Sequence, residues 1–437
     1  MSNLLIDDFE PSSAAAWKQK IQFELNGKEY KTLLTSTNEG ITIKPFYHSD
    51  DFEKLEIPVP NDAFKICQLI TITSEEEANK IALESVKQGV KSLKFILKKS
   101  FNIEVVFNQL LNKEIDFQFE FNFFSPVFIS ELATKLKNER VYFNIDIIGN
   151  LAKTGNWFKS LSEDFKNLEK IIQKNPTNYC LSVNVDLYQN AGANTVQQVA
   201  YAICHVNEYL LKFGGEIAAK IQFNFAIGSN YFFEISKLRA FRYLFKLVLN
   251  EYNTKAEPTI FAQPSLRNKT LLGSPENNLL RSKTECLSAV FGGANTILIP
   301  NSSKNLLFNT SKKLKEHGTQ NIATDSYYIE SITKQIAEKA LGIFKEIEKG
   351  GGFLSQLKEG TIQRKIKENA QKEQQQFNSG ELVIIGANKF KDETDTLKSD
   401  LSNNPFKEKK SHKTLIIPII PNRLSEKLEQ KKWRNEA

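Results

Sequence analysis

The strongest constraint on the fold is a regular alternation of short apolar segments with longer amphipathic ones, which begins near residue 65. Eight segments have the length and composition of buried strands: 65–72, 92–98, 115–123, 141–148, 180–187, 220–227, 258–263 and 295–300. Helical patterns separate most of them. Such alternation favours a parallel sheet, and eight units favour closure into a (β/α)8 TIM barrel.

One of these segments is unusual for a parallel strand. Phe117, Phe119 and Phe121 alternate strictly with Gln118 and Glu120. A parallel strand that is buried on both faces is normally apolar throughout. We therefore expect a sheet edge, a bulge or a polar barrel interior at this place.

The flanks of the chain differ in texture from the barrel segment, which we expect to span 61–389. Residues 1–60 predict an N-terminal arm, in which Trp17 and Ile21 begin a helical apolar stripe. Helical patterns continue at 326–349 and 353–377, and the polar stretch 390–413 is typical of a linker. In the tail, 414–437, two prolines in IIPIIP exclude a central strand and favour an extended arm on another surface.

Composition excludes several classes of protein. The 437 residues are 41% hydrophobic and 25% charged, which is typical of globular chains and not of disordered ones. A net charge of +7 is modest for this length, so we expect no nucleic-acid partner. No run of 18 apolar residues and no secretory signal is visible, which predicts a cytoplasmic protein without membrane contact.

The residue types that carry metal or nucleophilic chemistry are sparse. The four cysteines have no C-x-x-C spacing, which predicts reduced core thiols. The histidines, His48, His205, His317 and His412, include no pair at ligand spacing, and His205 lies in an apolar helical pattern typical of a structural residue. The sequence contains neither the phosphate-binding motif G-x-x-x-x-G-K-[ST] nor a G-x-G-x-x-G motif after a strand segment.

Isolated candidates for chemistry remain, each with a simpler interpretation. Asp186 ends the fifth strand segment, where a solvated acid is the commoner finding. Tyr328 could bind a ligand, although an aromatic residue at a helix start usually packs. The Lys-rich stretch 407–413 could attract phosphates but suits a solvated linker.

Five segments taken together resemble the methylmalonyl-CoA mutase family, whose members are adenosylcobalamin-dependent isomerases with a barrel threaded by acyl-CoA. They are EGITIKPFY in the arm, QNAGA at 189–193, FFEISKLRAFRYLF at 232–245, PENNLLR at 275–281 and SYYIE at 326–330. They occur in the family's order and tie residues 17–389 to it.

The departures from the family pattern concern its catalytic positions. Where the family reads Tyr-His-Met-Gln-Glu-Ala-Gly-Ala, this chain reads DLYQNAGA, so Leu187 replaces the imidazole that would polarise the thioester carbonyl. Leu69 replaces a tyrosine at the first strand. Ala262 and Pro264 replace a histidine and a glutamine after the seventh. The resemblance thus implies four degenerate positions and no catalytic, cofactor-binding or metal-binding residue.

The family's cobalamin-binding motif, Asp-x-His-x-x-Gly, is also missing, and fewer than fifty residues follow the barrel segment. The pattern is similar to the small, non-catalytic subunit of the family's heterodimeric bacterial members. It implies a large catalytic subunit as partner, which carries adenosylcobalamin and interconverts methylmalonyl-CoA and succinyl-CoA, and a chain that binds no cofactor and is inactive alone.

Two other functions stay open at the level of sequence. One is a stand-alone acyl-CoA-binding barrel or divergent acyl-CoA isomerase, with chemistry built on Asp186, Tyr188 and Tyr328. The other is an escort that loads cobalamin onto a partner protein.

Overall fold

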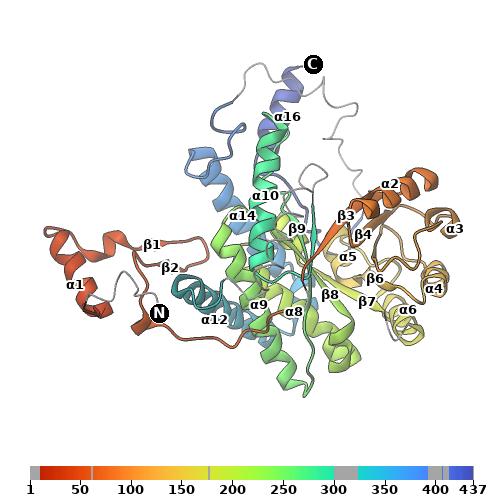
Figure 1. Cartoon of the computed structure of the whole chain (residues 1–437), viewed down its shortest axis with the longest axis horizontal. Helices are drawn as coiled ribbons and strands as arrows, with labels where there is room; N and C mark the ends of the chain where they lie inside the picture. Colours follow the sequence, from red (N-terminus) through yellow and green to blue (C-terminus); the bar gives the residue numbers. More distant parts are fainter. Residues whose placement is uncertain are drawn as a thin grey trace, which may run out of the picture.

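The computed structural model describes residues 10–60, 63–175, 178–299, 323–391, 406 and 413–436. Its centre is a closed barrel of eight parallel strands in the order β10-β3-β4-β5-β6-β7-β8-β9 (Figure 1). The strands are β3 (Lys65–Thr71), β4 (Ser92–Leu97), β5 (Asp116–Phe121), β6 (Arg140–Ile145), β7 (Tyr179–Asn184), β8 (Ile221–Ile227), β9 (Thr259–Pro264) and β10 (Thr296–Leu298). The predicted (β/α)8 barrel is confirmed.

Helices surround the barrel, and most begin at a residue whose side chain caps the first turn. Ser74 Oγ, for example, accepts the amide of Glu77 at 3.4 Å. The helices are α2 (Glu75–Lys87), α3 (Ile103–Val106), α4 (Pro126–Lys135), α6 (Leu161–Lys174), α8 (Thr195–Phe213), α9 (Tyr231–Glu251), α10 (Pro275–Phe291) and α12 (Tyr327–Lys349). Helix α12 packs across both α8 and α9.

Two strands end three residues earlier than the sequence pattern predicts, because a helix begins there. β7 ends at Asn184, because helix α7 (Val185–Asn190) begins at the next residue. β6 ends at Ile145, because Asp146 caps helix α5 (Ile147–Thr154) by accepting a backbone amide at 2.7 Å. A short buried helix is apolar on most sides, so its sequence continues the strand pattern without a visible break.

The predicted helix 353–377 is wrong as a single element. It consists of α13 (Phe353–Lys358) and α14 (Thr361–Ser379). Gly360 separates them with a left-handed φ of +78°, a conformation that ends helices and that glycine adopts without strain.

The interior of the barrel is polar. Gln222 on β8 is fully buried, and its Nε2 lies 3.0 Å from Gln118 Oε1 and 2.9 Å from both Asn144 Oδ1 and Asn224 Oδ1. Asn224 Nδ2 in turn donates to Asn184 Oδ1 at 2.7 Å. We call these five side chains the amide layer. Of the three explanations for the alternating pattern around Gln118, the polar interior is the one observed, since β5 is paired on both sides.

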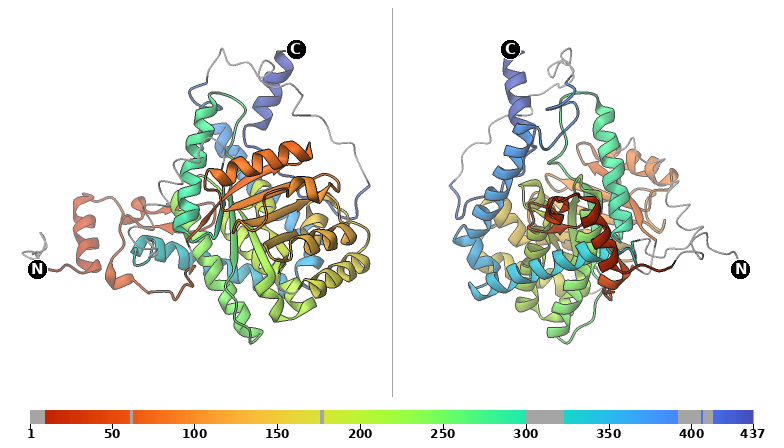
Figure 2. Two further views of the ribbon diagram at one scale, coloured as in Figure 1. Left: turned by 45° about the vertical axis from the view of Figure 1, so that its right-hand side comes forward. Right: turned by 90° about the vertical axis from the view of Figure 1, so that its left-hand side faces the viewer.

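The N-terminal arm, residues 10–60, stands off from the barrel (Figure 1 and the left view of Figure 2). It contains helix α1 (Ala14–Glu24), two 3-10 turns and a hairpin of β1 (Thr35–Ser36) and β2 (Thr42–Ile43). No residue of α1 is buried. Trp17 is 48% exposed and Phe23 is 78% exposed, so these two side chains do not pack on the chain's own barrel, whereas Ile21 is half-buried.

The C-terminal tail lies on the barrel. Residues 413–423 have no regular secondary structure, with a bend at 415–416, and a turn at 424–425 leads into helix α16 (Glu426–Asn435). Ile416 and Ile419 join the main hydrophobic core, and Leu424 joins a small second core at the end of α14. The predicted linker 390–413 falls mostly outside the described residues, and the domain boundaries stay predictions.

Candidate functional site at the barrel mouth

A cavity of about 220 Å³ lies at the C-terminal ends of β4 to β8, where barrel enzymes carry their active sites. Lys94 on β4 and Glu120 on β5 form an ion pair there, with Nζ 2.9 Å from Oε2. Asp186, the first acid after β7, lines the same cavity and accepts a hydrogen bond from Gln263 Nε2 at 2.9 Å. The sequence candidate Asp186 therefore lies at this end of the barrel, which we call the mouth.

The charges at the mouth shift one another's protonation. Burial raises the pKa of the Asp186 carboxyl to about 6; Glu120 adds to the rise, whereas Lys94 opposes it. The Lys94 ammonium lowers the pKa of Glu120. The mouth therefore offers one carboxyl that exchanges protons near neutral pH beside a neutralised ion pair. In the described chain, no imidazole lines this cavity that could polarise a thioester carbonyl.

The four positions predicted to be degenerate all lie toward the C-terminal side of the barrel, but only one lines the cavity. Leu187 on α7 is buried and forms part of its wall. Leu69 on β3 is half-buried, Ala262 is fully buried within β9, and Pro264 ends that strand. Whether their loss abolishes chemistry stays a prediction.

The residues suggested for a divergent isomerase do not converge. Tyr188 is fully buried, and its hydroxyl lies 2.9 Å from His205 Nδ1 inside the helical layer. Tyr328 on α12 packs against Tyr47 of the arm, with ring centroids 5.1 Å apart. Only Asp186 faces the mouth, so this combination of three residues is not assembled.

A buried network that the sequence pattern did not indicate links the mouth to the helical layer. His205 Nε2 lies 3.0 Å from Asp146 Oδ1, and the hydroxyl of Tyr209 donates to the same oxygen at 2.8 Å. Burial raises the pKa of Asp146, but His205 and hydrogen bonds from the Gly149 and Asn184 amides outweigh it, so the net pKa lies below the ordinary value. The sequence offered one signal for this network, namely that Asp146 precedes an apolar run and aspartate is a preferred helix cap.

Neither histidine within the described residues can serve as a ligand at the mouth. His205 is fully buried, as its helical pattern predicts, and His48 caps a turn in the arm by accepting the Asp50 amide at 3.1 Å. His317 and His412 lie outside the described residues. The cavity is also smaller than the roughly 300–1,000 Å³ that drug-sized ligands occupy. These residues do not fit adenosylcobalamin.

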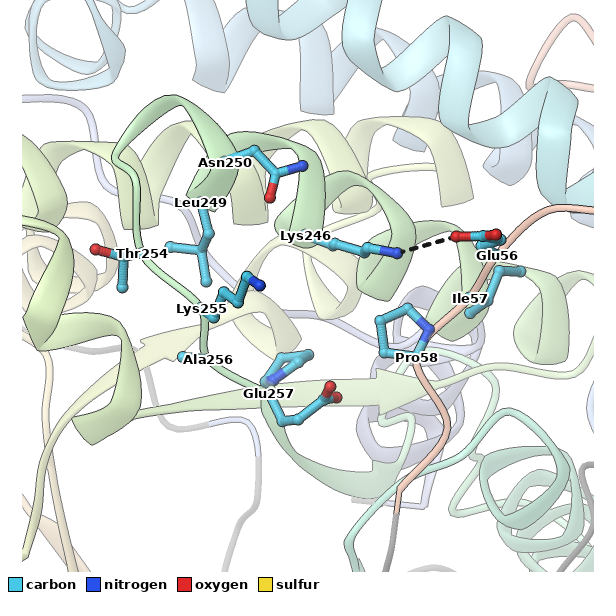
Figure 3. Close-up of a pocket in the computed structure, with 11 residues that line it drawn as sticks. Glu56, Ile57, Pro58, Lys246, Leu249, Asn250, Thr254, Lys255, Ala256 and Glu257 are labelled. Atoms are coloured by element: carbon cyan, nitrogen blue, oxygen red, sulfur yellow. Dashed lines mark ion pairs between the residues drawn. The ribbon is translucent and has the colours of Figure 1, made fainter.

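A second cavity of about 480 Å³ lies at the opposite end of the barrel, beneath the segment that joins the arm to β3 (Figure 3). It is lined by Pro58, by the end of α9 and by Pro258, which precedes β9. Two ion pairs involve its lining residues, Lys246 to Glu56 at 3.6 Å and Arg242 to Glu257 at 3.8 Å, and both are long. This end of a barrel usually serves stability, so we assign the candidate site to the mouth.

In the described ranges, no helix has the length and apolarity that a membrane crossing requires. All four cysteines are buried and form no disulfide.

Comparison with known proteins identifies the family. A family model described as methylmalonyl-CoA mutase matches residues 127–417. The chain is 29% identical to the methylmalonyl-CoA mutase small subunit of Porphyromonas gingivalis, an alignment that covers 88% of this chain and 71% of that protein. It is 32% identical to the methylmalonyl-CoA mutase of Cereibacter sphaeroides, over 48% of this chain and 33% of that protein. It is 24% identical to the mitochondrial methylmalonyl-CoA mutase of Bos taurus, over 86% of this chain and 60% of that protein. Because the family match covers well over half of its length, the chain belongs to the methylmalonyl-CoA mutase family.

Proposed function

We propose that this chain is the non-catalytic small subunit of an adenosylcobalamin-dependent methylmalonyl-CoA mutase, whose large subunit interconverts methylmalonyl-CoA and succinyl-CoA. The main support for this proposal is the alignment over 88% of the chain with a protein named as a small subunit of this enzyme. The cofactor belongs to the large subunit in this proposal. The free cysteines suit a reducing compartment, and we place the complex in the cytoplasm.

The barrel mouth supports the non-catalytic part of the proposal. Leu187 offers no hydrogen bond to a thioester oxygen, and oxyanion stabilisation needs donors near the developing charge. Below the mouth, the fully buried Gln222 and its amide neighbours fill the space along the axis. An acyl-CoA chain that entered the axis would have to break these hydrogen bonds without replacing them.

The exposed N-terminal arm supports the part of the proposal that concerns a partner subunit. An isolated helix of 11 residues is marginal in water unless its apolar side chains are buried. Phe23 and Trp17 are exposed on this chain, whereas Phe52 and Tyr47 farther along the arm pack on α12. The first half of the arm thus presents an apolar surface on an anchored base, which suits burial against a large subunit in a heterodimer.

An activity assay tests the non-catalytic role. The purified chain, supplied with adenosylcobalamin and methylmalonyl-CoA or succinyl-CoA, is expected to show no turnover above a blank. The Leu187→His variant is expected to stay inactive, because one imidazole neither opens the filled barrel axis nor creates a cofactor site. Turnover well above the blank by the unmodified chain would refute the proposal.

Co-expression with a cobalamin-bearing large subunit, followed by sizing, tests the heterodimer. A stable one-to-one complex is expected. The Phe23→Ser variant should lower its yield sharply, and deletion of residues 1–40 should abolish it while this barrel stays folded. Val127→Ser is the matched control, because Val127 is similarly exposed (70%) but lies on α4. Equal yields for all four chains would show that the arm is not the contact.

A further inference from the structure

We propose that the C-terminal face of the barrel contains a seat for a peptide segment without regular secondary structure, and that residues 413–425 of the same chain occupy this seat as a strap that closes the mouth. The inference goes beyond the proposed function and does not depend on mutase activity. It rests on four observations: the main-chain bonds of the strap, its side-chain pattern, the shape of its seat and its position.

The backbone of the strap is bound by several elements that are far apart in sequence. The amides of Leu415 and Ile419 donate to carbonyls at the end of α5, at 2.9 and 2.7 Å. The amide of Asn422 donates to the carbonyl of Asn190 on α7 at 3.0 Å, and that of Leu424 to a carbonyl in the loop after β9 at 2.9 Å. Main-chain hydrogen bonds hold a passing backbone largely independently of its side chains.

The side chains of the strap divide into two sets. Ile416 and Ile419 are only 8% and 3% exposed and pack in the main core. Leu415, Ile417 and Ile420 are 62–70% exposed. The seat therefore buries two aliphatic side chains three positions apart, whereas three apolar neighbours of this pair are exposed.

The seat is shaped to the strap. Gly155 ends α5 with a left-handed φ of +80°, and a Cβ at this position would lie 2.7 Å from the carbonyl oxygen of Ile416. The next side chain, that of Asn156, donates to the carbonyl of Lys413 at 3.1 Å and accepts the amide of Leu415 at 3.2 Å. Gly155 thus lets the backbone of the strap approach closely, and the side-chain amide of Asn156 both donates to that backbone and accepts from it.

The strap runs over the mouth. Pro421 lines the same cavity as Asp186 and Leu187. The next residue, Asn422, is hydrogen-bonded through its side chain to Arg267, which follows β9. Ligands enter a barrel of this type from the C-terminal face, so a strap in this place limits access to the cavity.

The decisive experiment compares two double variants of the full chain that have identical composition and charge. Ile416→Asp/Ile419→Asp removes the buried pair and should release the strap, whereas Ile417→Asp/Ile420→Asp changes only exposed positions. Loss of two buried isoleucines should speed hydrogen exchange of the strap amides at least roughly a hundredfold. The control variant should exchange like the unmodified chain. Equal exchange in the two variants would overturn the proposal.

A second measurement tests the seat itself. A labelled synthetic peptide of residues 413–436 should bind the released variant in a saturable manner, and the same peptide with Ile416→Asp/Ile419→Asp should not. The unmodified chain should bind neither, because its seat is occupied. If the aspartate pair does not fold, Ile416→Ala/Ile419→Ala against Ile417→Ala/Ile420→Ala is read in the same way. Absence of peptide binding to a folded, released variant would refute the seat.

Discussion

Replacing Asp186 with asparagine should stabilise the protein at neutral pH and leave its stability at pH 4 nearly unchanged. Burial raises the pKa of this carboxyl from its ordinary value of 3.8 to about 6, so the folded state holds a proton that the unfolded state has released. Between these two values the folded state binds more protons, and the stability contributed by this group falls as the pH rises. Asparagine carries no such charge and avoids the loss.

The size of the effect follows from the two pKa values. A difference of roughly 2 in pKa corresponds to about 3 kcal/mol. Because Asp186 is partly exposed at the mouth, solvent screening reduces the expected gain to about 1–3 kcal/mol above pH 6. The hydrogen bond from Gln263 can be kept, since the asparagine side-chain oxygen can accept it.

Urea unfolding of both chains from pH 4 to pH 8 measures this difference. The gap between the variant and the unmodified chain should open from about pH 4 and level off above about pH 6. Asp51→Asn in the exposed part of the arm is the control, and it should change stability by less than about 0.5 kcal/mol. A gap of constant size across this range, or a variant less stable at pH 7, would refute the assignment of a raised pKa to Asp186.

Three further predictions concern the interior, the seat and the axis. Gln222→Leu should cost about 2–4 kcal/mol in urea unfolding, because it leaves buried amide oxygens without donors, whereas exposed Gln375→Leu should cost less than about 0.5. Gly155→Ala should cost about 1–3 kcal/mol more than Gly380→Ala, since both have φ near +80° but only the first meets the strap. Calorimetric titration of the unmodified chain with a CoA thioester should give no micromolar binding, and such binding along the axis would contradict the filled interior.

The sequence predicted the barrel well, because a strand buried between two layers must be apolar over a short length. For the alternation of Gln118 and Glu120 with phenylalanines it left three explanations open, namely a sheet edge, a bulge or a polar interior, and only the pairing of β5 on both sides selects the polar interior. The place of Leu187 beside Asp186 at the mouth came from the family resemblance, because nothing in a leucine by itself points to a catalytic position.

The remaining features depend on contacts that no local pattern records. The apolar run after Asn184 continues a strand pattern, yet it forms a helix, and this turns Tyr188 away from the mouth and toward His205. The contact between Ile416 and Gly155 joins positions far apart in the chain. Prolines in the tail indicate an extended arm, but they do not indicate which surface it covers.

The position of the strap in the sequence means that its seat is synthesised before the strap itself. Every element that forms the seat, from α5 to α14, precedes the strap in the sequence. At translation rates of about 5–20 residues per second, the roughly 34 residues between the end of α14 and residue 413 take about 2–7 s to synthesise. A newly made barrel therefore passes through a stage in which its mouth is complete and open. Closure follows the formation of the barrel, and a chain whose synthesis stops before residue 413 stays at the open stage.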